Sequence, residues 1–559
     1  MSSTFPGPGG NPSMNQFCGD CGAVRAPDDR FCGACGAELA TDVTIRTLDG
    51  KGRLAWLDWL GGDWTDPSAT PPTSGLSGPK GILLTNRRLL EAQGPRMNGC
   101  VSRFVSRRHD QAGVSWHVLD AGDELGLSSD IADYVDFLTH HRERFFRDTE
   151  DDPVPVLLFG SESIIPMAVV ADPAGFGNDG DIDTDLPYSL QEVRDDWSSL
   201  LSKFRPRSTV GRIPFGAHYG MAHLESYLDA CGLMATGQST ESVFGLSARC
   251  WEGASRSVHD DVCGAEAGPL HLSPTIESGT VRGILDPRGH WHYFNLHGSD
   301  ADPHWFGQDE GNYPRAWHPD LFRHLNAWNM VGVEACYGAR FIGHAPKESA
   351  MLTALGHRTV AFVGSSRIAY GPPDPPEAYA DLVIRDFLKA ARSGLPAGEA
   401  LSLGHVSVLS QYLGDPDLIV KTVLEFNLFG DPLVRLPGPR SWRSPTPAAK
   451  QLVSRTSVPK VERIGRSGVN VLNEVRRMVE GRAAALQHTL DLALSRYPGL
   501  RTTLPRVSRI TFPARPGCLD SDQWFRFHYL APKSADQMPI EVLVYCDSNG
   551  ALRQVVEAK

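Results

Sequence analysis

The chain has 559 residues, of which 41% are hydrophobic and 21% charged, and its formal net charge is -12. This length exceeds one ordinary hydrophobic core, so about two to four domains are expected, and the composition is that of a globular protein. The acidic balance argues against broad binding to a nucleic-acid backbone, and no apolar run reaches the roughly 20 residues of a membrane helix.

The first residues are rich in Gly, Pro, Ser and Asn and lack the basic start and apolar middle of an export signal. They predict a disordered tail at residues 1–15 and a cytoplasmic protein. Most of the 11 cysteines are scattered without the spacing of a disulfide framework. Such cysteines are expected to stay reduced.

Two Cys-x-x-Cys knuckles follow the tail, within residues 16–40. Four thiolates from two tight turns form the tetrahedral sulfur set that zinc prefers and leave no open coordination position, which predicts a structural Zn2+ site. A redox-active pair of motifs is the alternative. The segment resembles the short zinc ribbons at the start of many bacterial proteins. The expected ligands are Cys18, Cys21, Cys32 and Cys35.

Residues 41–80 end in a stretch rich in Pro, Ser, Thr and Gly, which is typical of a linker. After it, short apolar runs alternate with a segment of helical spacing at residues 131–146. This alternation predicts an α/β fold with mostly parallel sheets. We expect a first α/β subdomain at residues 81–205 and a second, catalytic one at residues 206–437.

Two apolar strands, expected at residues 291–296 and 330–335, each end at a reactive side chain. His297 and Gly298 follow the first strand, and Cys336 follows the second. If the strands are parallel neighbours, their ends bring the imidazole beside the thiol, where it takes the thiol proton and later protonates the leaving group. The amides of Gly298 and Cys336 would then serve as two donors to an oxyanion. A small core residue is the ordinary alternative for a single Cys on a strand.

His-Gly after one strand and Glu-Ala-Cys-x-Gly after the next resemble the dyad of caspase-clan cysteine peptidases. Further pieces, in the same order along the chain, resemble the gingipain-type family, and the resemblance covers about residues 81–436. The pieces are LLFGS at 157–161, TDLPY at 184–188, VGRIP at 210–214 and NLFGDP at 427–432.

The resemblance implies a caspase-like core of two adjacent α/β subdomains. It makes Cys336 the nucleophile, His297 the general base and acid, and the amides of Gly298 and Cys336 the oxyanion donors. It also places Asp185 near the primary substrate pocket, where a carboxylate would pair with a substrate Arg or Lys. Asp183 is the neighbouring candidate, and a structural loop cap is the alternative for this segment.

Other polar groups lie close to the expected dyad. Imidazoles at two-residue spacing suit a transition metal, but no carboxylate completes a set, so packing or substrate contact is the alternative. Clustered oxygens after His297 are a candidate Ca2+ site. Glu334 and Arg367 either orient partners or form a structural salt bridge. The imidazoles are His290, His292, His304 and His318, and the acids are Asp300, Asp302, Asp309 and Glu310.

Residues 438–559 begin with a Pro/Ser/Arg-rich linker and continue with an amphipathic segment, expected to be helical, at residues 461–497. Strand-like runs near the end predict a C-terminal α+β recognition or regulatory module. This module and the zinc ribbon indicate a regulatory protein partner.

We therefore expect a cytoplasmic cysteine endopeptidase with a protein substrate. Gingipains are exported, whereas this chain lacks an export signal and carries a zinc ribbon, which favours limited cleavage inside the cell. Bacterial defence or cell death follows from clan analogy alone. The alternative is a catalytically silent scaffold whose ribbon and C-terminal module bind partners.

Overall fold

The computed structural model describes most of the chain after residue 78. The expected zinc ribbon, with its four cysteines, and the linker up to residue 78 lie outside the described residues. The described residues are 79–94, 97–145, 153–175, 179–216, 219–236, 243–264, 268–309, 311–411, 414–436, 453–454, 458–465, 475, 483–513, 522–531 and 540–559.

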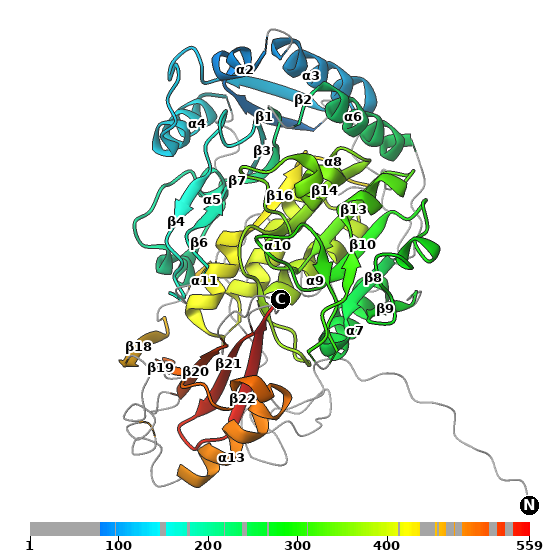
Figure 1. The fold of residues 1–559 in the computed structure, drawn as a ribbon. Coiled ribbons are helices and arrows are strands. Elements are labelled where there is room, and N and C mark those ends of the chain that lie inside the picture. The colour runs from blue at the N-terminus through cyan, green and yellow to red at the C-terminus, as the bar shows by residue number, and fades with distance from the viewer. Residues whose placement is uncertain are drawn as a thin grey trace, which may run out of the picture. The chain divides into compact units, whose positions relative to one another are not determined.

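A ten-stranded sheet forms the centre of the described structure (Figure 1). Its first half is β2 (Ser115–Asp120), β1 (Lys80–Thr85), β3 (Val154–Phe159), β7 (Ser208–Ile213) and β16 (Phe426–Gly430). Its second half is β14 (Thr359–Ser365), β13 (Asn329–Val333), β10 (Trp291–Asn295), β8 (Val243–Ala248) and β9 (Leu270–Ser273).

Strands within each half run parallel, and the halves meet at the antiparallel pair of β14 and β16. The predicted α/β class with a mostly parallel sheet is therefore confirmed. The two expected subdomains share one continuous sheet, which is a difference from the prediction. β7 lies after the expected boundary at residue 206, but it pairs with β3 of the first expected subdomain. Val156 and Leu158 of β3 align in parallel register with Val210 and Arg212 of β7.

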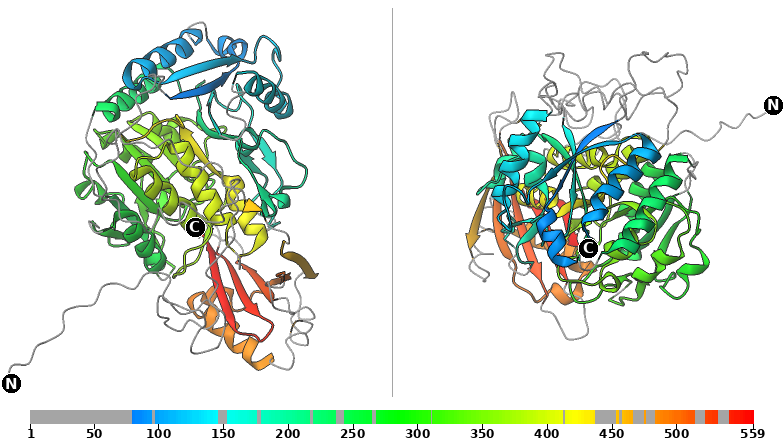
Figure 2. Two further views of the ribbon diagram at one scale, coloured as in Figure 1. Left: turned by 180° about the vertical axis from the view of Figure 1, so that it is seen from behind. Right: turned by 90° about the horizontal axis from the view of Figure 1, so that it is seen from above.

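Helices cover the sheet (Figure 2). They are α2 (Arg87–Gln93), α3 (Asn98–Ala112), α4 (Ile131–Phe145), α5 (Leu186–Leu190), α6 (Met221–Thr236), α7 (Glu252–Cys263), α8 (Ala350–Leu355), α9 (Ala380–Arg392), α10 (Ala397–Leu409) and α11 (Pro416–Glu425).

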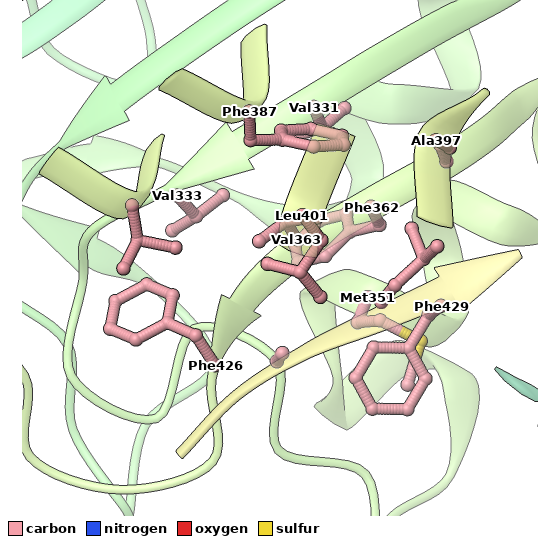
Figure 3. Packing of buried hydrophobic residues seen from close by; sticks show 14 of the residues in the cluster. Val331, Val333, Met351, Phe362, Val363, Phe387, Ala397, Leu401, Phe426 and Phe429 are labelled. Atoms are coloured by element: carbon pink, nitrogen blue, oxygen red, sulfur yellow. The ribbon is translucent and has the colours of Figure 1, made fainter. Parts of the chain in front are cut away.

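Two glycines permit close packing between these helices and the sheet or a neighbouring helix. Gly332 of β13 lies against Ile384 and Leu388 of α9, and Gly404 of α10 lies against the Val383 backbone. Buried side chains from β13, β14, β16 and α8 to α10 fill the space between these elements (Figure 3).

Short elements complete the core region. The paired short strands are β4 (Ala168–Val170) with β5 (Ile182–Thr184), β11 (Trp305–Phe306) with β12 (Arg315–Trp317), and β6 (Lys203–Phe204) with β17 (Val453–Ser454). The 3-10 helices are Trp197–Leu201, Arg249–Trp251, Val281–Gly283, Pro319–His324, Pro346–Glu348, Leu494–Arg496 and Pro498–Leu500.

A second, antiparallel sheet contains the last strands of the chain. Its order is β15 (Tyr370–Gly371), β22 (Leu552–Ala558), β21 (Glu541–Asp547), β20 (Gln523–Leu530), β19 (Arg506–Thr511) and β18 (Lys460–Gly465), with helix α13 (Ala483–Ala493) beside it. Residues 460–465 form a strand and not part of the expected helix, because their backbone pairs with β19. β15 comes from the central part of the chain, so this sheet joins the C-terminal region to the core.

Alternating side chains of this second sheet enter two different hydrophobic clusters. Phe525, Phe527 and Val544 pack with Leu490 of α13 in a separate cluster. The intervening residues, such as Leu543, belong to the main core. Successive side chains of a strand point to opposite faces, so the sheet is covered on both sides.

Among the residues that the structure describes, no helix is long and apolar enough to cross a lipid bilayer.

His292 of β10 is a buried imidazole inside an aromatic cluster. It is fully buried between Phe244 and Phe294, and neither ring nitrogen has a hydrogen-bond partner within the described structure. Burial lowers the pKa of His292 to about 3. The unfolded chain therefore binds a proton at His292 below about pH 6.5 that the folded chain does not bind, and stability falls as the pH falls.

We expect His292→Phe to reduce the acid sensitivity of the fold. The wild type should lose about 3 kcal/mol of stability through this group between pH 7 and pH 4, and the variant should not. Urea unfolding of both proteins at the two pH values measures the difference. His109→Phe replaces an exposed histidine and is the matched control; an equal acid response of all three proteins would contradict the assignment.

Candidate active site

The ends of β10 and β13 lie side by side, as the sequence predicts for parallel neighbours. Phe294 pairs with Val333 in register, so His297 and Cys336 each lie three positions beyond a matched pair. A Cβ atom on Gly298 would lie 1.7 Å from the carbonyl oxygen of Cys336. Only glycine permits this approach of the two backbones.

His297 is held by its main chain and by its ring. Its N–H and C=O exchange hydrogen bonds with Phe306 at 2.9 and 2.8 Å. The ring Nε2 lies 2.6 Å from Oε1 of Gln308, and the ring packs on Trp251 with centroids 4.2 Å apart. Burial lowers the pKa of His297 to about 4, and the nearby ammonium of Lys559 adds to the effect. The imidazole is therefore neutral at pH 7 and able to accept a proton.

Cys336 is a buried thiol in this structure. Its Sγ donates to the carbonyl oxygen of Ala369 at 3.6 Å, and burial raises the pKa of the thiol. In the described part of the chain, Cys336 and His297 share no direct hydrogen bond. Burial lowers the pKa of His297 and raises that of Cys336, so both groups are neutral at pH 7, and the thiol points at Ala369.

The backbone that carries Cys336 is strained and anchored. Tyr337 has a φ of 54°, in the left-handed region, which costs about 1 kcal/mol or more for a residue of this size. Its hydroxyl donates to Asp179 at 3.0 Å, and Asp179 also accepts from the N–H of Ile368 at 3.1 Å and from Lys421. One buried carboxylate thus fixes both the turn after Cys336 and the segment around Ala369.

The amide of Cys336 points at a main-chain oxygen. It donates to the carbonyl oxygen of Lys559 at 2.7 Å, and the N–H of Lys559 donates to Ala369 at 2.9 Å. The amide of Gly298, the other expected oxyanion donor, has no hydrogen-bond partner among the described residues. The amide of Gly298 is thus unpaired within the described structure, and the amide of Cys336 already holds the carbonyl oxygen of Lys559.

A buried acidic pocket lies next to Cys336. Glu334 and Asp381 are both fully buried, and both accept from Nζ of Lys559. The same ammonium lies 5.6 Å from the centroid of the Trp251 ring. Burial disfavours the charge on Lys559, but the two carboxylates outweigh it and raise the pKa of Lys559. Two acids and an aromatic face form a site for one basic side chain.

Asp185 and Asp183 lie in different surroundings. Both carboxylate oxygens of Asp185 accept from Arg212, at 2.8 and 2.6 Å, and both side chains are buried. This bidentate pair binds the buried carboxylate of Asp185 to the buried guanidinium of Arg212, so the geometry favours the structural alternative. Asp183 is paired with Arg367 at 3.0 Å and is only partly exposed. The other expectation for Arg367, a structural salt bridge, therefore agrees with the geometry.

The candidate metal ligands do not converge. Within the described ranges, no group of at least three His, Cys, Asp or Glu side chains is placed to hold a metal ion. Asp302 accepts from His304 and pairs with Arg315 at 3.2 Å, and His318 packs edge-on to His304. His290 packs on Trp328. Glu310 of the candidate calcium site lies outside the described residues.

A second Cys–His pair lies on α7. Sγ of Cys263 is 3.5 Å from Nε2 of His259, a closer contact than the Cys336 pair makes. His259 is fully buried, and its Nε2 is also 3.3 Å from the carbonyl oxygen of Val243. Both residues are buried and lie one turn apart on the same helix, so this pair has the features of core packing.

Several residues of the site were not found from the sequence. Trp251 and Gln308 position His297, Asp381 completes the acidic pocket, and Lys559 fills it. Trp251, Asp381 and Lys559 are far from the dyad in sequence, and Gln308 lies 11 positions after His297, but no motif marks any of the four. Glu334 lies two positions before Cys336, so the sequence itself places it beside the thiol.

Comparisons with known proteins were made for sequence and for structure. No protein-family model and no curated protein matches the sequence. Among solved structures, part of the fold is similar to a chain of the Saccharomyces cerevisiae separase–securin complex, with a TM-score of 0.27 and 11% sequence identity. The similarity covers 40% of this chain and 14% of the matched chain, so this chain corresponds to a small part of that protein's length.

We expect Asp185→Ala to lower stability without changing cleavage preference. It leaves the guanidinium of Arg212 buried without its carboxylate partner, at a cost of about 3–5 kcal/mol. Urea unfolding measures this loss, and Asp195→Ala, which removes an exposed carboxylate, is the control. Unchanged stability together with lost cleavage after basic residues would restore Asp185 as a pocket residue.

Proposed function

We propose that the chain is a cysteine endopeptidase that cleaves protein substrates after a basic residue, with Cys336 as nucleophile and His297 as general base and acid. The observation that carries the proposal is the main-chain carbonyl oxygen of Lys559, which the amide of Cys336 holds at 2.7 Å. This is the place where a scissile carbonyl must lie for the thiol of the same residue to attack it.

The chemistry follows from the positions of these groups. His297 accepts the proton of the Cys336 thiol, and the sulfur attacks the carbonyl carbon. The amide of Cys336, and that of Gly298 when substrate is bound, stabilise the resulting oxyanion. His297 then protonates the leaving amine, which departs as the thioester forms. A water molecule, deprotonated by His297, attacks the thioester, and breaking its C–S bond restores the thiol and releases the acid.

The basic preference is supported by the acidic pocket of Glu334 and Asp381. These two carboxylates are fully buried, so each unpaired negative charge there is costly. A substrate lysine offers one compact ammonium to both of them, as Lys559 does. An apolar residue in the same place would leave the acids without a cation.

The geometry also favours limited cleavage over general digestion. The residue Cys336 is 5% exposed and His297 is 8% exposed, so a substrate reaches them only as an extended strand that fits the site. We extend the proposal to a regulated enzyme with a protein substrate; a cytoplasmic location and a defence role remain expectations from the sequence.

We expect Cys336→Ala to abolish cleavage of fluorogenic peptides that end in lysine. His297→Ala should lower kcat/KM by about 10²- to 10⁴-fold, because a general acid–base group contributes that much. Cys263→Ala removes the thiol of the other Cys–His pair and should leave the rate unchanged. Turnover that survives in Cys336→Ala, or none in any protein under any condition, would favour the catalytically silent scaffold.

We expect Glu334→Gln to weaken the preference for basic residues. The loss of one buried carboxylate should lower kcat/KM for a lysyl peptide by about tenfold or more relative to an alanyl peptide, since a charge-assisted contact contributes about 1.5–3 kcal/mol. The ratio of the two kcat/KM values is the measurement, because it is insensitive to the fraction of active enzyme. An unchanged ratio would exclude Glu334 from the pocket.

A further inference from the structure

We propose that the chain's own segment of residues 557–559 occupies the substrate site in cis, so that the described state is a self-inhibited one. This inference rests on the proposed function, since it treats the site as one that binds a peptide strand. The occupant is identified directly, because it is seated on the site in the structure. Its three residues are Glu557, Ala558 and Lys559.

The main chain of the segment is bound as an added strand. β22 pairs in antiparallel register with β15, matching Ala558 to Tyr370 and Glu557 to Gly371. The register continues into Lys559, whose N–H donates to Ala369 and whose carbonyl oxygen accepts from the amide of Cys336. Backbone pairing of this kind supplies affinity for an extended peptide. The backbone donor and acceptor on either side of the thiol are therefore both in use.

The side chains of the segment are also specifically held. The ammonium of Lys559 lies between Glu334 and Asp381 and is fully buried. Glu557 accepts from the indole N–H of Trp251 at 2.9 Å. Trp251 is the same ring that packs on His297, so the segment contacts the residues that position the base as well as the pocket.

The segment reaches the site because the rest of its strand is fixed elsewhere. β22 pairs with β21 from Leu552 to Glu557, and β21 and β20 pack on the second hydrophobic cluster. Figures 1 and 2 show β22 (red) running from this sheet toward the helices of the core, where the chain end is marked. A tethered occupant competes at a high effective concentration with any substrate in solution.

Occupation excludes a substrate by direct overlap. A peptide with lysine before its scissile bond needs the same amide donor, the same carbonyl acceptor and the same two carboxylates. The apparent affinity for such a peptide is therefore the intrinsic affinity multiplied by the fraction of molecules in which the segment has left the site. The exclusion is the same whether the carbonyl of Lys559 belongs to a carboxylate, as in a bound product, or to a peptide bond, as in a bound substrate.

The first experiment measures access to Cys336 without requiring catalysis. Lys559→Glu places a carboxylate between Glu334 and Asp381, and a chain that ends at Val556 lacks both pairs with β15 while keeping most of the β21 pairing. Alkylation of Cys336 by iodoacetamide, followed by peptide mass spectrometry, should be about tenfold faster in both variants than in the wild type. Lys347→Glu reverses the charge of an exposed lysine and should match the wild type.

Cys231 serves as the internal reference for folding. It is fully buried in α6, so its alkylation rate rises only if the protein opens more widely. A faster reaction at Cys336 with an unchanged rate at Cys231 supports occupation in cis. An unchanged rate at Cys336 overturns it. If both rates rise, the variant has lost structure and the binding measurement described next decides.

The second experiment restores the occupant in trans. The fluorescein-labelled peptide EAK, which has the sequence of residues 557–559, is added to the chain that ends at Val556 and carries Cys336→Ala, in which residues 552–556 keep their own place in the sheet. Fluorescence anisotropy should show saturable binding, at least about tenfold tighter than that of EAE, because only lysine pairs with the two acids. Equal affinity of the two peptides, or no binding of either, would overturn the inference.

Peptide turnover separates this inference from the proposed function. If the lysyl peptide binds and Cys336 becomes accessible but no variant cleaves any peptide, the inference of occupation in cis is supported. The proposed peptidase activity is then contradicted. If the wild type cleaves lysyl peptides as fast as Lys559→Glu and the Val556-ending chain do, the peptidase activity stands and the inhibition is overturned.

Discussion

The contact between the backbones of Gly298 and Cys336 is the constraint on which the rest of the site depends. It requires parallel neighbouring strands in matched register, and it tolerates no side chain at position 298. The position of the imidazole, the direction of the Cys336 amide and the acidic pocket at Glu334 all follow from these two strand ends. The helices and the strained turn at Tyr337 serve to keep this approach fixed.

Buried charge organises the surroundings of the dyad. Lys421 contacts Asp179 on one side of Cys336, and Lys559 contacts Glu334 and Asp381 on another. The first pair joins residues within the core and anchors loops. The second joins the last residue of the printed sequence to the core, so it persists only while the C-terminal strand is in place. The two sets of ion pairs therefore have different consequences, because the contacts of Lys559 depend on the position of the C-terminal strand and that of Lys421 does not.

Much of the central region was predictable from the sequence. The apolar runs that end at His297 and Cys336 indicate buried strands, the alternation of such runs with helical spacing favours a parallel sheet, and glycine after His297 fits a close approach. The acid at position 185 was ambiguous, since its partner Arg212 lies 27 positions away and sequence does not reveal which side chains meet. The strand at residues 460–465 was missed because its pairing with β19, not its own pattern, decides its conformation. The role of Lys559 depends on a tertiary contact across 225 positions.

β22 belongs to two ladders of unequal length. Its pairing with β15 has two residue pairs, whereas its pairing with β21 has five. The C-terminal sheet also contacts the core elsewhere, because Arg526 of β20 and Tyr545 of β21 both donate to the buried carboxylate of Asp415, at 2.6 and 2.8 Å. Departure of residues 557–559 therefore breaks both pairs with β15 and one pair with β21, and it leaves the remaining contacts between the sheet and the core in place.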